Sequence, residues 1–219
     1  GLFRGSALAL GIIAVASSLH QAALMALLVL GLILFLVPHS VRIVADDWRS
    51  AQVARLGLPA WKGLYSLVSI AGLALIVWGY GMARTAPIEI WSPPVFTRHL
   101  ASLFTLAAFV LLVAAYVPRN RIKAAIGHPM VASVKLWAFA HLLANGTVAD
   151  VLLFGSFLLW AIFDFRAARR RDRAAGAKPA GPGAASFASD VIVVLVGFGA
   201  WALFAFQLHG WLFGVRPFG

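Results

Sequence analysis

The sequence contains no cysteine among its 219 residues. This absence excludes disulfide bonds, thiolate metal sites, iron–sulfur clusters and a cysteine nucleophile. Acidic residues are also scarce, with 7 Asp and Glu in total. The sequence has no His-Glu-x-x-His motif and no glycine-rich phosphate loop. Any metal chemistry therefore depends mainly on histidine, and hydrolysis by paired carboxylates is unsupported.

Charge of either sign is sparse, because Asp, Glu, Lys and Arg make up only 11% of the chain, whereas 62% is hydrophobic. A soluble domain carries roughly 25% charged residues. Several apolar runs reach the roughly 20 residues that cross a bilayer as a helix. We therefore predict an all-α, polytopic transmembrane bundle of about six spanning helices. They cover approximately residues 22–37, 61–83, 100–117, 129–144, 148–165 and 191–208.

The connections between these helices differ in character. Residues 46–60 are polar, residues 84–99 are rich in proline, and residues 166–189 are rich in arginine and then in Ala, Gly and Pro. We interpret the last stretch as a flexible linker. The first helix could end at Pro38 or continue through it toward Asp46, because a helical bundle can satisfy the backbone groups that proline leaves unpaired.

The first 24 residues are predicted to form an N-terminal extension. Residues 7–16 are apolar and follow Arg4, which is typical of a signal-like segment or of an extra helix. Residues 25–219 then form the main transmembrane domain.

The basic residues indicate an orientation. The chain carries a net charge of +11, and fourteen Lys and Arg fall in or beside residues 42–62, 119–135 and 166–178, against three on the opposite side. The positive-inside rule places the richer loops in the cytoplasm. The lipid bilayer is the expected partner of these charges, so nucleic acid is not.

Among the hydrophobic segments, residues 127–146 contain an unusual number of polar side chains. Within this segment Trp137, His141 and Asn145 are four residues apart, so they share one face of a helix. Such a face can form interhelical hydrogen bonds. It can also hold a tetrapyrrole, which needs a neutral imidazole for iron and flat apolar walls.

Four other histidines lie in or beside the predicted helices. His39 follows Pro38, where it could bond an unpaired carbonyl or face the bundle interior. His128 precedes Pro129 and could cap a helix, and His209 lies at the outer end of the last predicted helix. His99, which precedes the third helix, is the weakest candidate.

Several blocks of this sequence resemble the NnrU family. They are Leu36–Ser40, Gly127–Pro129, Lys135–Gly146 and His209–Val215. The resemblance extends over nearly everything from Met25 to the end. The family is associated with bacterial denitrification, through nitrite and nitric oxide metabolism. It is similar to the 15-cis-zeta-carotene isomerases, integral membrane proteins that use haem b for a redox-dependent double-bond isomerisation.

The resemblance implies a haem b site. His39 and His141 would be its axial ligands, and His128 and His209 are further family positions. The implied partners are denitrification enzymes or a small apolar substrate. Ala138 lies one turn before His141, so a mechanism that exchanges a thiolate ligand is impossible in this chain.

Depth in the membrane favours different pairs. His141 lies only four residues before Asn145, roughly 6 Å from the outer turn, whereas His39 lies nearer the cytoplasmic end. By depth alone His39 pairs with His128, and His141 pairs with His209.

Two other functions stay open. The protein could be an accessory factor without a cofactor, or a membrane methyltransferase, since His128-Pro129 is similar to a motif of isoprenylcysteine methyltransferases.

Overall fold

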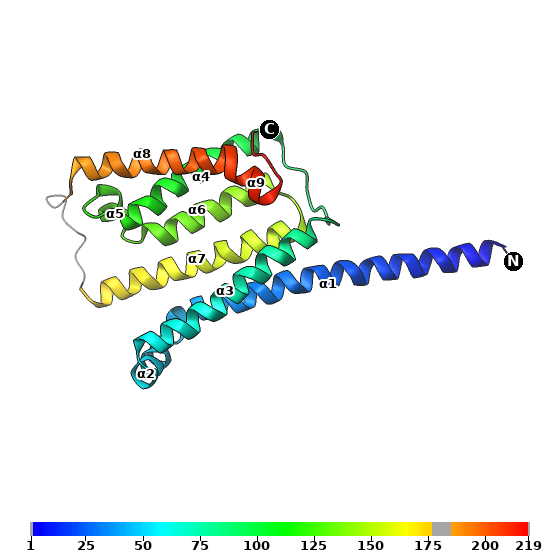
Figure 1. The fold of residues 1–219 in the computed structure, drawn as a ribbon, viewed down its shortest axis with the longest axis horizontal. Coiled ribbons are helices and arrows are strands. Elements are labelled where there is room, and N and C mark those ends of the chain that lie inside the picture. Colours follow the sequence, from blue (N-terminus) through cyan, green and yellow to red (C-terminus); the bar gives the residue numbers. More distant parts are fainter. Residues whose placement is uncertain (1, 177–184, 219) are drawn as a thin grey trace. The chain divides into compact units, whose positions relative to one another are not determined.

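The computed structural model describes residues 2–176 and 185–218, and these residues are almost entirely helical (Figure 1). Within these ranges the extended backbone pairing is an isolated bridge between Glu89 and Thr147. The predicted all-α class is confirmed.

Five helices are long and apolar enough to cross a membrane. They cover Gln21–Val44, Leu58–Ala83, Val95–Tyr116, Val148–Ala174 and Phe187–Phe213. A further apolar helix, α6 (Pro129–Ala144), has 16 residues. At about 1.5 Å per residue it is roughly 24 Å long, shorter than the ~30 Å hydrocarbon core. The described chain is thus a multi-pass membrane protein with five full-length candidate spans and one short helix.

The chain divides into two compact units. Unit 1 comprises Gly1–Val41 and Asp47–Ile88, and unit 2 comprises Arg42–Asp46 and Glu89–Gly219. The predicted division near residue 24 stays a prediction, and helix α1 is continuous from Leu2 to Val44.

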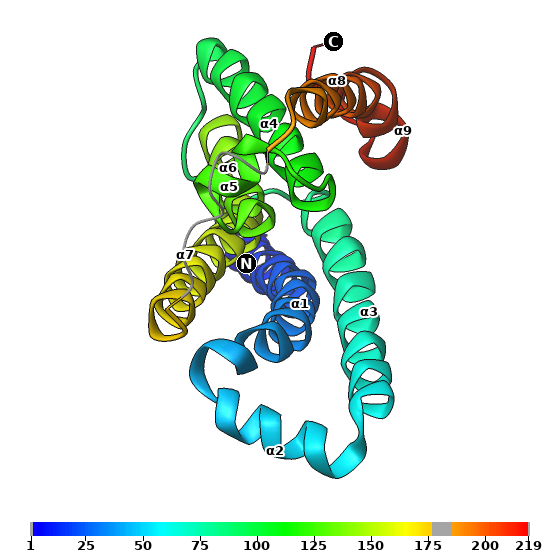
Figure 2. The ribbon, with the colours of Figure 1, turned by 90° about the vertical axis from the view of Figure 1, so that its left-hand side faces the viewer.

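Unit 1 is built on α1 (Leu2–Val44), α2 (Asp46–Leu56) and α3 (Leu58–Ala83). Helices α1 and α3 run side by side (Figures 1 and 2). Glycines let their backbones touch: a Cβ on Gly31 would lie 2.6 Å from the Ile76 nitrogen, and one on Gly79 would lie 2.5 Å from the Leu28 nitrogen. Small residues at such a crossing are a recurrent way to pack membrane helices.

Helix α1 passes through Pro38 without ending, so the continuing form of the first predicted helix is correct. The turn around Pro38 carries extra side-chain bonds, because His39 Nδ1 donates to the Phe35 carbonyl at 2.6 Å. The Ser40 hydroxyl likewise donates to the Leu36 carbonyl at 2.7 Å. These bonds supplement the helix where proline lacks its donor.

In unit 2 the central helix is α6. Helix α6 packs between α4 and α7, and α8 covers the other side of α4 (Figure 2). The remaining elements follow α8 or precede α6. The bounds are α4 Val95–Tyr116, α5 Arg121–Ile126, α7 Val148–Ala174, α8 Phe187–Leu203, the π-helical turn η2 Phe204–Leu208 and α9 His209–Phe213.

Some predicted boundaries were wrong. Helix α7 continues to Ala174 instead of ending at Phe165, so residues 166–174 are helical and do not belong to a flexible linker. The rest of that predicted linker includes residues 177–184, which lie outside the described residues. The polar connector at 46–60 contains helix α2. In both places a helix forms in polar sequence, for which hydropathy alone predicts a loop.

Candidate functional site

The turn between α6 and α7 is held by local capping. Asn145 ends α6 in extended conformation (φ −131°, ψ 145°), and its Nδ2 donates to the His141 carbonyl at 2.8 Å. Thr147 begins α7, where the Asp150 amide donates to Thr147 Oγ1 at 3.3 Å and the Thr147 amide donates to Asp150 Oδ2 at 2.9 Å. This reciprocal capping box fixes the helix start beside the end that carries His141.

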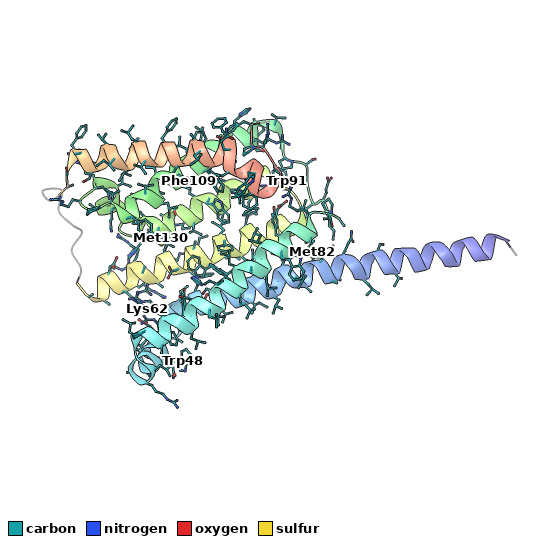
Figure 3. The ribbon with its side chains drawn as sticks, in the orientation of Figure 1. Trp48, Lys62, Met82, Trp91, Phe109 and Met130 are labelled. Atoms are coloured by element: carbon teal, nitrogen blue, oxygen red, sulfur yellow. The ribbon has the colours of Figure 1, made fainter. Side chains whose placement is uncertain are left out.

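The loop before α4 is bonded to the same turn. The amides of Ile90 and Trp91 donate to the Gly146 carbonyl at 2.7 and 3.2 Å. Trp91 Nε1 donates to the Asn145 carbonyl at 3.2 Å, and Figure 3 labels this tryptophan. The predicted proline-rich loop therefore closes over the α6–α7 turn.

His141 lies among aromatic rings. Its imidazole is stacked on Phe154 of α7, with ring centroids 4.5 Å apart and planes at 27°. Trp137 lies 5.1 Å from it on α6. Trp137 in turn meets Phe154 and Phe157 edge-on, at 5.2 and 5.7 Å. The helix spacing predicted the proximity of Trp137 to His141, and the two phenylalanines complete an apolar wall.

The hydrogen bond of His141 sets its chemistry. Nδ1 lies 2.8 Å from the Trp137 carbonyl oxygen. A carbonyl only accepts, so Nδ1 carries the proton and the neutral ring presents the Nε2 lone pair. A histidine that binds a metal through one ring nitrogen typically donates a hydrogen bond from the N–H of the other nitrogen in this way.

His209 follows the π-helical turn η2, at the start of α9. Its Nδ1 donates to the Val215 carbonyl at 2.7 Å, and its ring lies 5.1 Å from Phe213. The predicted pairing of His141 with His209 stays a prediction.

His39 belongs to unit 1. Its ring is stacked on Phe35, with centroids 4.3 Å apart, and lies 5.0 Å from Tyr65 of α3. Its Nδ1 bonds a carbonyl one turn earlier in the helix, the same arrangement as in His141. The predicted pairings of His39 with His141 or with His128 stay predictions.

His128 is engaged differently. It occupies the N-cap position of α6, as predicted, but its side chain does not bond the helix end. Its Nε2 lies 2.8 Å from Asp172 Oδ2 on α7, in an ion pair if the ring is protonated. The ring also meets Phe165 edge-on at 6.1 Å. The Nε2 atom of His128 is therefore engaged by a carboxylate.

Within residues 2–176 and 185–218, no three His, Cys, Asp or Glu side chains come together as a metal cluster. Iron in a haem needs only one or two protein ligands, because the porphyrin supplies four. The neutral imidazole of His141 and its aromatic walls are chemically suited to that role.

Several of these neighbours were not predicted. Phe154 and Phe157 lie at helical spacing from Asp150 on α7, so projecting the predicted hairpin onto two facing helices could have identified them. Trp91 had no comparable signal, since its partner Asn145 is 54 residues away in sequence.

Comparison with known proteins identifies a family. The family model described as NnrU protein matches residues 27–217 of this chain. No curated protein and no solved structure matches the chain. The matched range contains every histidine discussed above. The chain therefore belongs to the NnrU family.

Proposed function

We propose that this protein binds haem b in the membrane, with His141 as an axial ligand of the iron. The function would lie in bacterial nitrite and nitric oxide metabolism, or in a related redox-dependent isomerisation of a small apolar substrate. The family resemblance suggests the haem, and the surroundings of His141 in this chain support its role as a ligand.

One observation carries the proposal. The His141 Nδ1 proton is held by the Trp137 carbonyl at 2.8 Å, which leaves Nε2 as a lone-pair nitrogen inside an apolar segment. A polar side chain within a transmembrane bundle costs free energy, and such residues commonly serve a function. An imidazole arranged in this way has the tautomer that an axial ligand needs.

The neighbouring residues have separate roles in this proposal. Stacking of Phe154 on His141 fixes the imidazole plane, and Trp137 and Phe157 exclude water from the same side. Asp150 is buried and fixes the start of α7 through its bonds to Thr147. When bound, haem b supplies one-electron redox chemistry, while the protein supplies the ligand and the dry surroundings.

The membrane orientation is part of the proposal. The end of unit 2 that holds His128 also carries the basic residues of α5 and of the last turns of α7. By the positive-inside rule this end faces the cytoplasm of a bacterial inner membrane. His141, at the other end of α6, then lies toward the outer side.

The test is haem reconstitution. The protein is purified in mild detergent from cells supplied with haem precursor, and its oxidised and reduced spectra are recorded with a pyridine haemochrome assay. We expect a Soret band and the haemochrome of haem b in stoichiometric amount. A protein that folds normally and lacks both would instead support the accessory-factor alternative.

Single alanine variants of His39 and His209 then identify the second ligand. Loss or displacement of the band in His39→Ala supports the ligand pair implied by the family. The same effect in His209→Ala supports the pair favoured by depth. Retention in both assigns His141 as the one histidine ligand among the three.

A further inference from the structure

The cytoplasmic-end extension of α7 has a surface that haem binding does not explain. Helix α7 has 27 residues, about 40 Å at 1.5 Å per residue, whereas the hydrocarbon core is roughly 30 Å thick. Its apolar part ends near Phe165, and five arginines follow within residues 166–173.

These arginines fall on two faces. Arg166, Arg169, Arg170 and Arg173 have spacings of three, four and seven residues, so they form one stripe, and all four are exposed. We call these four residues the arginine stripe. The opposite face contains the buried residues Ala167 and Ala168, 3% and 5% exposed.

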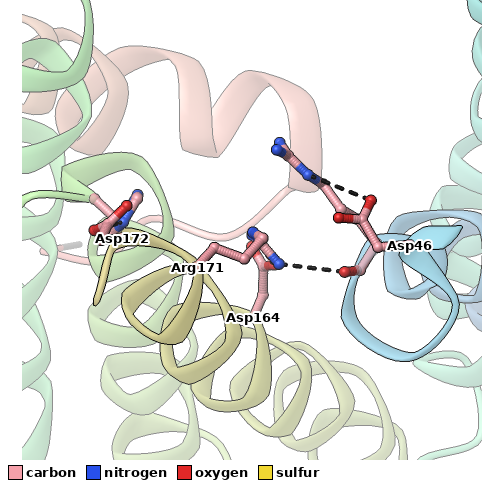
Figure 4. A network of polar contacts seen from close by, with 6 residues as sticks. Asp46, Asp164, Arg171 and Asp172 are labelled. Carbon is pink, nitrogen blue, oxygen red and sulfur yellow. Dashed lines mark hydrogen bonds and ion pairs between the residues drawn. The ribbon is translucent and has the colours of Figure 1, made fainter. Parts of the chain in front are cut away.

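The acidic side chains of this segment are already paired with residues outside the arginine stripe. Asp164 lies 3.9 Å from Arg171, and Asp172 lies 2.8 Å from His128 (Figure 4). Arg171 also donates to the main-chain carbonyl of Arg42 at 3.2 Å. Among the residues that the structure describes, no acid or other hydrogen-bond acceptor pairs with a guanidinium of the arginine stripe.

The arginine stripe continues an exposed side of α7. Leu159 and Phe163 are 59% and 55% exposed. They precede Arg166 and Arg170 at the spacing that keeps residues on one helix face. The same face is therefore apolar within the span and cationic immediately beyond it. A phospholipid has this sequence of properties along its length, with acyl chains followed by a phosphate.

We propose that the arginine stripe binds the headgroups of anionic phospholipids, with Leu159 and Phe163 against the acyl chains. Guanidinium groups bind phosphate oxygens in a bidentate manner. A basic segment directly beside a membrane span is typical of recognition of anionic lipids. Neither free phosphate nor nucleic acid would use the exposed apolar residues on this face.

The experiment measures lipid retention by native mass spectrometry of the full chain in detergent. Phosphatidylglycerol and phosphatidylcholine are added at equal concentration to wild type, to Arg166→Gln/Arg170→Gln and to the control Arg98→Gln/Arg216→Gln. Each double variant removes two exposed positive charges. We expect wild type and control to retain phosphatidylglycerol preferentially, and the α7 variant to bind it at least about tenfold more weakly.

Three outcomes would overturn the proposal. The two double variants could lose phosphatidylglycerol equally, which would assign the effect to net charge. Inorganic phosphate could compete as well as the lipid does, which would assign the site to a soluble anion. Lastly, the α7 variant could keep wild-type lipid retention while losing binding to a labelled DNA duplex. Circular dichroism of each variant verifies that helix content is unchanged.

Discussion

The main-chain oxygen of Trp91 occupies the space that a Cβ on Gly146 would need. The contact joins the loop before α4 to the turn that follows His141, and two amides of the loop donate to the Gly146 carbonyl. A glycine at this position is therefore required by close approach of two backbones.

The Gly146→Ala variant should lose stability. The added methyl group collides with backbone that cannot rotate away, so we expect a loss of about 1–3 kcal/mol in the free energy of unfolding. Thermal unfolding in detergent measures it. Gly155→Ala is the control on the same hairpin, since its Cβ would meet only Val151 Cγ1 at 4.0 Å. Equal melting temperatures for the two variants would contradict the packing described here.

The α1–α3 crossing predicts a second glycine effect. A Cβ on Gly79 would lie 2.5–2.8 Å from backbone atoms of Leu27 and Leu28, whereas one on Gly81 would meet nothing within 4 Å. We expect Gly79→Ala to destabilise the protein by about 1–3 kcal/mol. Gly81→Ala should leave stability unchanged or raise it, because alanine favours helix. Limited proteolysis of the full chain compares the two variants by the rate of cleavage within unit 1. Faster cleavage of Gly81→Ala than of Gly79→Ala would be inconsistent with this crossing.

The capping box of α7 makes a third prediction. Thr147→Ala removes the hydroxyl that accepts from the Asp150 amide and donates to its carboxylate at 2.7 Å. The expected loss is about 1 kcal/mol, the usual value for a helix N-cap. Thr147→Ser retains the hydroxyl and should keep most of the stability. Chemical denaturation of both variants distinguishes a capping role from loss of the methyl group, which would affect Ser and Ala alike.

His128 gives a prediction of no effect on haem. Its Nε2 is bonded to Asp172 at 2.8 Å, so His128→Ala should retain the absorption band of the reconstituted protein. Asp172→Asn should also retain it. The pair is partly exposed, so either variant should cost less than about 1 kcal/mol of stability. A band lost in His128→Ala and preserved in Asp172→Asn would place His128 among the ligands.

Local signals predicted parts of this fold well. Helix α6 has the predicted bounds, 129–144, because Pro129 favours a helix start and Asn145-Gly146 favours a stop. The extension of α7 was missed, since it depends on Ala167 and Ala168 being buried against neighbours. Burial by tertiary contact cannot be read from the hydropathy of one segment.

The candidate site shows the same limit. The four-residue spacing placed Trp137 beside His141, and the turn predicted that α7 would face them. Which residues of α7 would meet the imidazole depended on the register of the hairpin, which the capping box of Thr147 and Asp150 determines. The contact of Trp91 with the turn is non-local and had no sequence signal.

The most direct test of the account is the spectrum of haem-reconstituted His141→Ala beside His99→Ala. His99 is exposed on α4 and serves as the matched histidine control. We predict that His141→Ala loses or shifts the Soret band, that added imidazole partly restores it, and that His99→Ala matches wild type. An unchanged band in folded His141→Ala would contradict the assignment of His141 as a ligand.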